Sequence, residues 1–367
     1  MAEQPAKDLE ARLKRRIALE GPITLADYMT AVLTDPKGGY YMEGDPFGRA
    51  GDFVTAPEVS QMFGEMIGLW CIDLWQRVLG APGRVILAEL GPGRGTLMAD
   101  ILRSAKVSPE FAAAAEVHLV EVSPALKEKQ RETLSGQKVI WHKDGAGLPE
   151  SAPLIVIANE FFDALPVRHF EKTAQGWRER LVGLDETRDR LVFHQGPVSP
   201  SALAFIPPAL HEAAEGSIAE VSPAVVSQTA ALAERLEAQG GAALVIDYGR
   251  AHPAFGATLQ AVRGHERHDP LEAPGSADLT AHVDFPAMIA AAEETGAAAF
   301  GPVTQGDFLR ALGIELRAEN LKAANPDSTA VVDQALYRLI DAEAMGELFK
   351  AVVLMQSGLE APAPFVL

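Results

Sequence analysis

Apolar residues recur along the chain at two spacings, which predict helices near its start and alternating strands and helices after them. Leu9, Leu13 and Ile17 follow one another at four-residue steps and predict a helix. A Gly-Pro pair ends this pattern, and Thr24 is placed to cap a second helix. Residues 57–79 are strongly apolar at three- and four-residue steps, so we expect one buried helix there.

Seven short apolar runs predict the strands of a sheet. They lie at residues 85–90, 117–122, 139–141, 154–158, 242–246, 297–303 and 348–355. Crossover helices and a closing pair of strands indicate an α/β fold with a Rossmann-like, seven-stranded, mostly parallel sheet. We expect a helical N-terminal region and active-site cap over residues 1–80, and a core over residues 81–367 with insertions at about 168–240 and 304–346. The first insertion is predicted to be an α+β segment, because residues 169–194 alternate like antiparallel strands.

A glycine-rich loop follows the first of these strands. Gly91, Gly93 and Gly95 precede a segment that can form a helix, and Glu89 lies two positions before the first of these glycines. Glycines in such a turn let a ligand approach the backbone closely. A pyrophosphate would be repelled by Glu89, whereas the ammonium and sulfonium of S-adenosylmethionine (SAM) would be attracted. The loop therefore favours SAM over NAD or FAD, and a purely structural turn is the remaining alternative.

Two acidic residues further along the chain could bind other parts of such a cofactor. Glu121 ends the second strand, where a carboxylate can accept both ribose hydroxyls. Taken in isolation, it would more simply be a solvated glutamate at a strand end. Asp144 follows the third strand and could accept the adenine amino group, although Asp-Gly is also a common turn dipeptide.

Polar residues at two later strand ends mark the expected position of the methyl acceptor. The run at residues 154–158 delivers Asn159, Glu160 and Asp163 to the same rim as the glycine loop. An asparagine amide both donates and accepts, and carboxylates can orient a cationic nucleophile. The same carboxylates could also stabilise a helix N-terminus. Asp247 and Tyr248 end the fifth strand on this rim.

Two segments with little periodicity are expected to border the site. Residues 35–56 are dense in Gly, Pro, Asp and aromatic residues, and we interpret them as a loop across the cofactor mouth, with a structural cap as the rival interpretation. Residues 249–285 hold four histidines, including His282, which we place at the border of the active site. We expect no metal site, because these histidines form no pair on one helical face and have no cysteine partner.

The composition narrows the partners and the compartment. A formal net charge of −18 argues against nucleic acid as a partner and favours cationic substrates. The single cysteine, Cys71, lies in an apolar helical pattern, where we expect it to be buried. No apolar run is long enough to span a bilayer, and acidic residues before the first basic cluster argue against a transit peptide. We therefore expect a protein of the bacterial cytoplasm that is not integral to a membrane.

These motifs resemble the MidA-like proteins, whose mitochondrial members are SAM-dependent arginine methyltransferases that assist the assembly of respiratory complex I. The resemblance covers nearly the whole chain. It rests on GGYY at residues 38–41, GDFVTAPEVSQMFGE at 51–65, LAELGPGRGTLMADIL at 87–102, ANEFFDALPV at 158–167, IDYG at 246–249 and DLTAHVDF at 278–285. At Ala56 many relatives have serine, which puts one hydroxyl contact in doubt.

The resemblance implies a class I methyltransferase core with an added helical N-terminal region. It assigns the cofactor to Glu89 and the three loop glycines, the ribose to Glu121, and closure over the site to the segment with Asp52, Phe53 and Thr55. The acceptor would be an arginine of a protein substrate, namely a complex I subunit.

An arginine acceptor is cationic, and paired carboxylates can hold its guanidinium bidentately. We therefore expect Glu160 and Asp163 to leave one guanidinium nitrogen in line with the methyl group. Two other functions fit the same core: methylation of a small molecule or of another residue, and SAM binding without turnover in an assembly factor. The eukaryotic relatives would act in the mitochondrial matrix.

Overall fold

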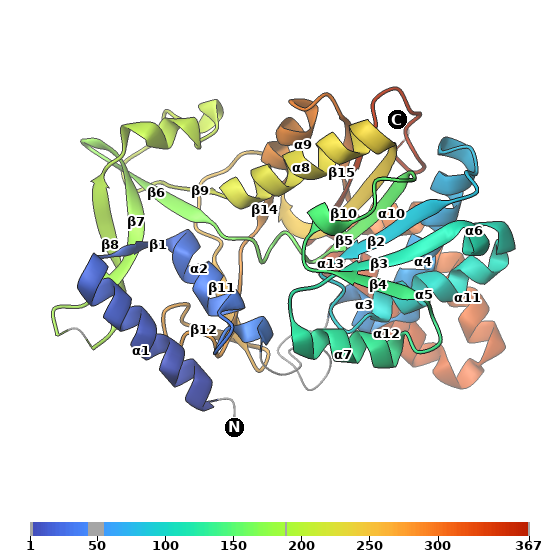
Figure 1. The fold of residues 1–367 in the computed structure, drawn as a ribbon, viewed down its shortest axis with the longest axis horizontal. Coiled ribbons are helices and arrows are strands. Elements are labelled where there is room, and N and C mark those ends of the chain that lie inside the picture. The colour runs from blue at the N-terminus through green and yellow to red at the C-terminus, as the bar shows by residue number, and fades with distance from the viewer. Residues whose placement is uncertain (1–2, 43–54, 188, 366–367) are drawn as a thin grey trace. The chain divides into compact units, whose positions relative to one another are not determined.

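The computed structural model describes residues 3–42, 55–187 and 189–365, and the chain divides into two compact units (Figure 1). The first unit comprises residues 1–53, 162–228 and 250–288, and the second comprises residues 54–161, 229–249 and 289–367. Each unit is therefore assembled from three separate stretches of the chain.

The second unit is built on the predicted sheet. Its strands are β2 (Val85–Leu90), β3 (Ala115–Val120), β4 (Val139–His142), β5 (Leu154–Asn159), β10 (Gly241–Arg250), β15 (Ala298–Thr304) and β16 (Phe349–Met355). They lie in the order β15-β16-β10-β5-β2-β3-β4. The neighbours from β10 to β4 are parallel, and β16 is antiparallel to both β10 and β15. This order confirms the seven predicted strands and their mostly parallel arrangement, and one short further strand lies off this path and makes the sheet eight-stranded.

Strands β2 and β5 form the centre of this sheet and are buried at every position. A parallel strand covered on both faces is a continuous apolar run, which is why both were recognisable in the sequence. The fifth strand is longer than predicted. It continues through Asp247 and Tyr248 because these residues pair with Lys350 and Phe349 of β16.

Helices surround the sheet of the second unit. They are α3 (Ala56–Val59), α4 (Gln61–Asp73), the π-helix η2 (Leu74–Val78), α5 (Thr96–Ser104), η3 (Ala105–Val107), α6 (Pro109–Ala114), α7 (Pro124–Thr133), η4 (Gly145–Gly147), α10 (Gln305–Ala311), α11 (Ile314–Ala324), η7 (Pro326–Ser328), α12 (Thr329–Ile340) and α13 (Met345–Leu348). Two further helices, α8 (Pro223–Gln239) and α9 (Phe285–Glu293), contain residues of both units.

The single helix predicted over residues 57–79 is wrong in one respect. Ser60 has an extended backbone, with φ −163° and ψ 142°, and separates α3 from α4. Its hydroxyl accepts a hydrogen bond from the backbone N–H of Met62 at 3.2 Å and so caps α4. The apolar face is as predicted, since Trp70 and Cys71 are 1% and 0% exposed.

The first unit combines helices with two antiparallel sheets. Its elements are α1 (Glu3–Glu20), β1 (Ile23–Thr24), α2 (Leu25–Thr34), η1 (Tyr40–Met42), β6 (Arg168–Thr173), β7 (Gly176–Leu184), β8 (Leu191–Val198), η5 (Pro200–Ala204), η6 (Pro208–Leu210), β9 (Ile218–Val221), β11 (Gln260–Arg263), β12 (Glu266–His268), β13 (Asp278–Thr280) and β14 (Val283–Asp284). One sheet has the order β1-β7-β6-β9 with β8 on β7, and the other has the order β12-β11-β13. The small second sheet lies in the stretch that the sequence predicted to be mainly loop.

Side chains of α1, α2 and the two sheets share a core in the first unit. Thr24 caps α2 as predicted, since its hydroxyl accepts from the backbone N–H of Asp27 at 3.0 Å. Among the described residues, none of the helices combines the length and apolar character needed to cross a membrane.

Candidate active site

The glycine loop begins at Gly91, directly after the end of β2. Gly91, Gly93 and Gly95 have positive φ angles of 59°, 52° and 83°. A side chain at Gly91 would also collide with Phe161, because an added Cβ would lie 2.9 Å from Cδ2 of the ring. The loop therefore needs glycine both for its backbone conformation and for the close approach of a ring.

Glu89 is a buried carboxyl group beside this loop. It is 3% exposed, and its Oε2 atom has no hydrogen-bond partner among the described residues. Burial raises the pKa of Glu89 to about 8; the backbone N–H of Met98 opposes this shift, and the charge of Glu121 adds to it. A cation placed against the unpaired oxygen would reverse this shift and recover the cost of burial.

Glu121 follows β3 and is 6% exposed. Its Oε1 atom accepts from the backbone N–H of Ser123 at 2.7 Å, and its Oε2 atom accepts from the amide of Gln130 at 3.0 Å. Burial raises the pKa of Glu121, and these two hydrogen bonds oppose the rise. We did not predict Gln130 as a site residue. The signal that could have identified it is its position, since it is a polar residue four positions after Leu126 on the buried face of α7.

Asp144 caps a short turn after β4. Its Oδ1 atom accepts from the backbone N–H of Gly147 at 3.0 Å, and the side chain is exposed. The Asp-Gly turn considered from the sequence is thus present. Its contact with adenine stays a prediction.

Asn159 and Glu160 lie at the carboxyl end of β5. Register pairs Leu90 with Ala158, so Asn159 follows on the same edge of the sheet as Gly91. Glu160 has a positive φ of 49°, which is strained for a residue with a side chain. Its Oε1 atom accepts from the Asn159 amide at 3.1 Å, and the Oδ1 atom of Asn159 is buried without a partner in the described part of the chain.

The segment after Thr55 is connected to this edge of the sheet. The backbone N–H of Ala56 donates to Oε1 of Glu160 at 2.9 Å. Glu58 accepts from the hydroxyl of Thr96 at 2.6 Å and forms an ion pair with Arg94 at 3.6 Å. Helix α3 is therefore held against both the glycine loop and the end of β5. Asp52 and Phe53 lie outside the described residues.

In the first unit, three of the sequence motifs meet around a tyrosine. The hydroxyl of Tyr41 donates to the carboxylate of Asp278 over 2.9 Å. Burial, followed by the charges of Asp278 and Asp163, raises the pKa of Tyr41 well above its ordinary value. Asp163 is 6% exposed, and its backbone carbonyl accepts from the N–H of Ala281 at 2.9 Å. Residues from 38–41, 158–167 and 278–285 thus share one polar environment.

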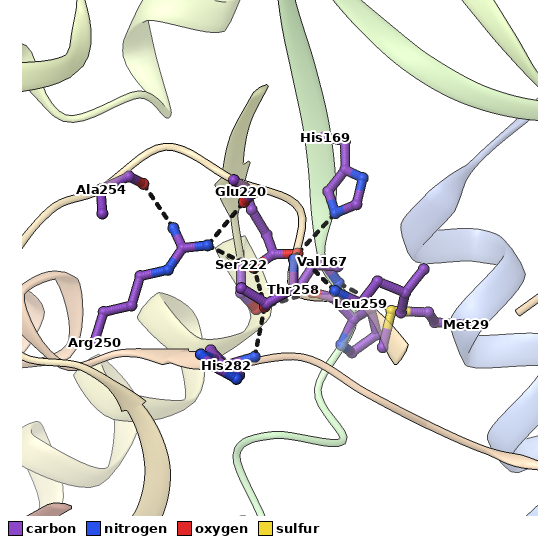
Figure 2. A network of polar contacts seen from close by, with 12 residues as sticks. Met29, Val167, His169, Glu220, Ser222, Arg250, Ala254, Thr258, Leu259 and His282 are labelled. Carbon is purple, nitrogen blue, oxygen red and sulfur yellow. Dashed lines mark hydrogen bonds and ion pairs between the residues drawn. The ribbon is translucent and has the colours of Figure 1, made fainter. Parts of the chain in front are cut away.

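Next to this region, the first unit holds a buried carboxylate that the sequence did not reveal. Figure 2 shows Glu220 among donors from several segments. Its carboxylate binds Nε2 of His169 at 2.8 Å, Nη2 of Arg250 at 3.4 Å, and the backbone N–H groups of Thr258 and Leu259 at 2.9 and 3.2 Å. The hydroxyl of Thr258 also donates to it. The protein itself satisfies this carboxylate.

The same network positions His282. The backbone N–H of His282 donates to the hydroxyl of Thr258 at 2.8 Å, as Figure 2 shows. Burial lowers the pKa of His282; Glu220 opposes the shift and Arg250 adds to it. Burial therefore favours the neutral form of this imidazole.

The remaining predicted residues lie in β10. Asp247 is 0% exposed, and its Oδ1 atom accepts from the backbone N–H of Tyr248 at 2.9 Å. The ring of Tyr248 packs on Phe349 with centroids 5.3 Å apart. Across the described ranges, no three His, Cys, Asp or Glu side chains group in a way that could hold a metal ion.

Comparison with known proteins decides the family. A family model described as "Putative S-adenosyl-L-methionine-dependent methyltransferase" matches residues 66–303. The "Protein arginine methyltransferase NDUFAF7 homolog, mitochondrial" of Drosophila melanogaster is 39% identical over 98% of this chain and 87% of its own length. The chain belongs to this methyltransferase family. The human "Protein arginine methyltransferase NDUFAF7, mitochondrial" is 38% identical over 96% of this chain and 85% of its own.

A solved structure extends the comparison to the cofactor. A Burkholderia thailandensis protein crystallised with S-adenosyl-homocysteine is 32% identical, covers 98% of this chain and 94% of its own, and superposes with a TM-score of 0.85. The methyltransferase thus has the class I fold and uses SAM as its cofactor. The residues beside the glycine loop fit SAM, because Glu89 offers it a buried, unpaired carboxyl oxygen there.

Proposed function

We propose that this methyltransferase transfers a methyl group from SAM to an arginine side chain of a protein, a subunit of respiratory complex I whose assembly it thereby assists. The observation that carries the proposal is the 39% identity, over 98% of the chain, to a relative named as a protein arginine methyltransferase. The complex I acceptor rests on the resemblance of the motifs at residues 51–65 and 158–167 to the MidA-like family.

SAM supplies a methyl group already activated by the positive sulfonium. We assign its ammonium to Glu89, its ribose to Glu121 and its adenine amino group to Asp144, with Gly91, Gly93 and Gly95 lining its path. The assignment to Glu89 is supported by the unpaired Oε2 atom and by the raised pKa, since both conditions are relieved by a bound cation. Thr55 would close over the bound cofactor.

The acceptor guanidinium is assigned to Asn159, Glu160 and Asp163. Two protein hydrogen bonds hold Oε1 of Glu160, from Ala56 and from Asn159, so the carboxylate is oriented before substrate arrives. The unpaired Oδ1 atom of Asn159 is a natural acceptor for a guanidinium N–H. A guanidinium held in this way keeps one nitrogen directed at the methyl group. Asp247, Tyr248 and His282 are assigned to the border of this site.

The test is a methyl-transfer assay with labelled SAM and complex I subunits, followed by mapping of the labelled residue. We expect label on an arginine. Glu160→Gln should lower kcat by about 100-fold while SAM affinity stays within about twofold, because the residue acts on the acceptor. Glu132→Gln, an exposed glutamate on α7, is the matched control. Label on a small molecule, or SAM binding without any transfer, would contradict the proposal.

A further inference from the structure

One buried amide, that of Gln130, joins three segments around the cofactor site. Gln130 is 0% exposed and lies on the inner face of α7. A polar side chain buried to this extent costs free energy unless its hydrogen-bonding groups find partners. Its partners therefore indicate what the side chain does.

The hydrogen-bonding groups of this amide are matched to three different segments. Nε2 donates to the carbonyl oxygen of Gly93 at 2.8 Å and to Oε2 of Glu121 at 3.0 Å. Its oxygen accepts from Nε1 of Trp141 at 2.9 Å. An indole N–H can only donate and the Gly93 carbonyl can only accept, so these partners fix which end of the amide is nitrogen.

These contacts set the position of Glu121 relative to the glycine loop. One carboxylate oxygen is held by Ser123 and the other by Gln130, so the plane of the carboxylate is fixed. The loop also packs on the same glutamine, since a Cβ added to Gly95 would lie 3.5 Å from Cα and Cγ of Gln130. Loss of the amide would release the loop and the carboxylate from each other.

We propose that Gln130 is a positioning residue that directs the carboxylate of Glu121 at the ribose hydroxyls of the cofactor and holds it at a fixed distance from the glycine loop. This inference rests on the proposed assignment of Glu121 to the ribose. It implies a loss of affinity that is mainly specific to the ribose, because the glycine loop keeps its own backbone hydrogen bonds, from Gly91 to Val120 at 3.0 Å and from Gly95 to Pro92 at 2.7 Å, without the amide.

The experiment compares the dissociation constants of S-adenosylhomocysteine and its 2′-deoxy analogue by calorimetry. The wild-type protein should prefer the hydroxylated ligand by about tenfold, the usual effect of one hydrogen bond to a charged group. Gln130→Leu should weaken the hydroxylated ligand by about tenfold and leave the deoxy analogue within about threefold, so that the preference nearly disappears. Gln137→Leu, at an exposed glutamine, should change neither affinity.

A second variant keeps the test valid if Gln130→Leu folds poorly. Trp141→Phe removes the N–H that fixes the amide but keeps a ring beneath Arg131, whose guanidinium carbon lies 5.1 Å from the Trp141 centroid. It should reduce the ribose preference in the same direction by a smaller factor. Thermal unfolding of both variants confirms that the binding data describe folded protein.

The possible results distinguish a failure of the role of Gln130 from a failure of the assignment of Glu121 to the ribose. Equal weakening of both ligands in the two variants would overturn the inference, since packing alone affects the whole cofactor. If the wild-type protein does not distinguish the ligands and Glu121→Gln leaves both affinities unchanged, the ribose assignment fails and the inference fails with it. Neither result depends on which acceptor is methylated, so the arginine proposal is tested separately.

Discussion

Two buried glutamates, one in each unit, are treated in opposite ways by the protein around them. Glu220 is 6% exposed and accepts hydrogen bonds from His169, Thr258 and Leu259 besides its contact with Arg250. Burial alone would raise its pKa, but the hydrogen bonds and charge of His169 and the contacts of Thr258 lower the pKa below its ordinary value.

Glu89 is 3% exposed, yet one of its oxygens has no partner among the described residues and its pKa is raised to about 8. A fold gains nothing from a buried carboxyl group that it leaves half unsatisfied. We infer that Glu220 serves stability and Glu89 serves ligand binding. The comparison teaches that the number of internal partners separates these two roles better than burial does.

The largest expected effect is on the stability of the first unit. Glu220→Leu should lower the free energy of unfolding by about 3–5 kcal/mol, because it leaves Arg250 and the donors of Thr258 without their buried acceptor. Urea unfolding followed by circular dichroism measures this loss. Glu215→Leu, at an exposed glutamate in the same stretch, should stay within about 0.5 kcal/mol of wild type. A similarly small loss for Glu220→Leu would contradict the inference that Glu220 serves stability.

The next effect is on cofactor affinity. Glu89→Gln keeps the size of the side chain but removes its charge, so SAM binding should weaken by about 1.5–3 kcal/mol. Near pH 4.5 the free energy of unfolding should remain within about 1 kcal/mol of wild type, because the carboxyl group of Glu89 is then protonated in the ligand-free fold and as neutral as the amide. Calorimetry and urea unfolding on the same samples measure the two quantities. A large loss of stability with unchanged affinity for SAM would show that Glu89 serves stability and does not serve ligand binding.

The parts recognised from the sequence are those whose chemistry is local. Strand, glycine loop and helix are contiguous, so Glu89 could be placed beside the loop from residues 84–98 alone. The role of Glu220 could not be predicted in this way, since its partners His169, Arg250 and Thr258 lie 51, 30 and 38 residues away along the chain. Long-range pairing of this kind leaves no periodic signal.

Gln130 escaped for the same reason, being 37 residues from Gly93. The helix break at Ser60 and the strands β11 to β13 were missed on other grounds. A single capping hydroxyl decides the break, and strands of three or four residues are too short to show a clear alternation.

The two carboxylates should also give opposite dependences of stability on pH. The raised pKa of Glu89 means that the folded state holds its proton more tightly, so its contribution to stability falls as the pH rises from about 4.5 to about 8. The lowered pKa of Glu220 makes its contribution present above about 4.5 and lost as the pH falls through the folded value.

Each slope is limited to about 1.4 kcal/mol per pH unit. Unfolding of Glu89→Gln and Glu220→Gln between about pH 2.5 and pH 8.5 measures these slopes by difference from wild type. Glu89→Gln should be the flatter protein above pH 5, and Glu220→Gln the flatter one below it. Slopes of the same sign for both residues would contradict the comparison.

The smallest expected effect concerns a third carboxylate, Asp144, which stands between the two cases. It is exposed, and its Oδ1 atom accepts from Gly147 to cap a turn, as an internally satisfied carboxylate does. The proposed contact with adenine requires a second role. Asp144→Ser separates the two, because a serine can still cap the turn but is too short to reach a ligand.

We expect Asp144→Ser to weaken SAM binding by about 0.5–1.5 kcal/mol with stability within about 0.5 kcal/mol of wild type. Measured against adenosine as well as SAM, the loss should be equal for the two ligands, because both carry the adenine amino group. Asp144→Ala is the companion variant: it should add a loss of stability of about 1 kcal/mol from the missing cap. Unchanged affinity for both ligands in Asp144→Ser would show that Asp144, like Glu220, stabilises the fold and does not contact the cofactor.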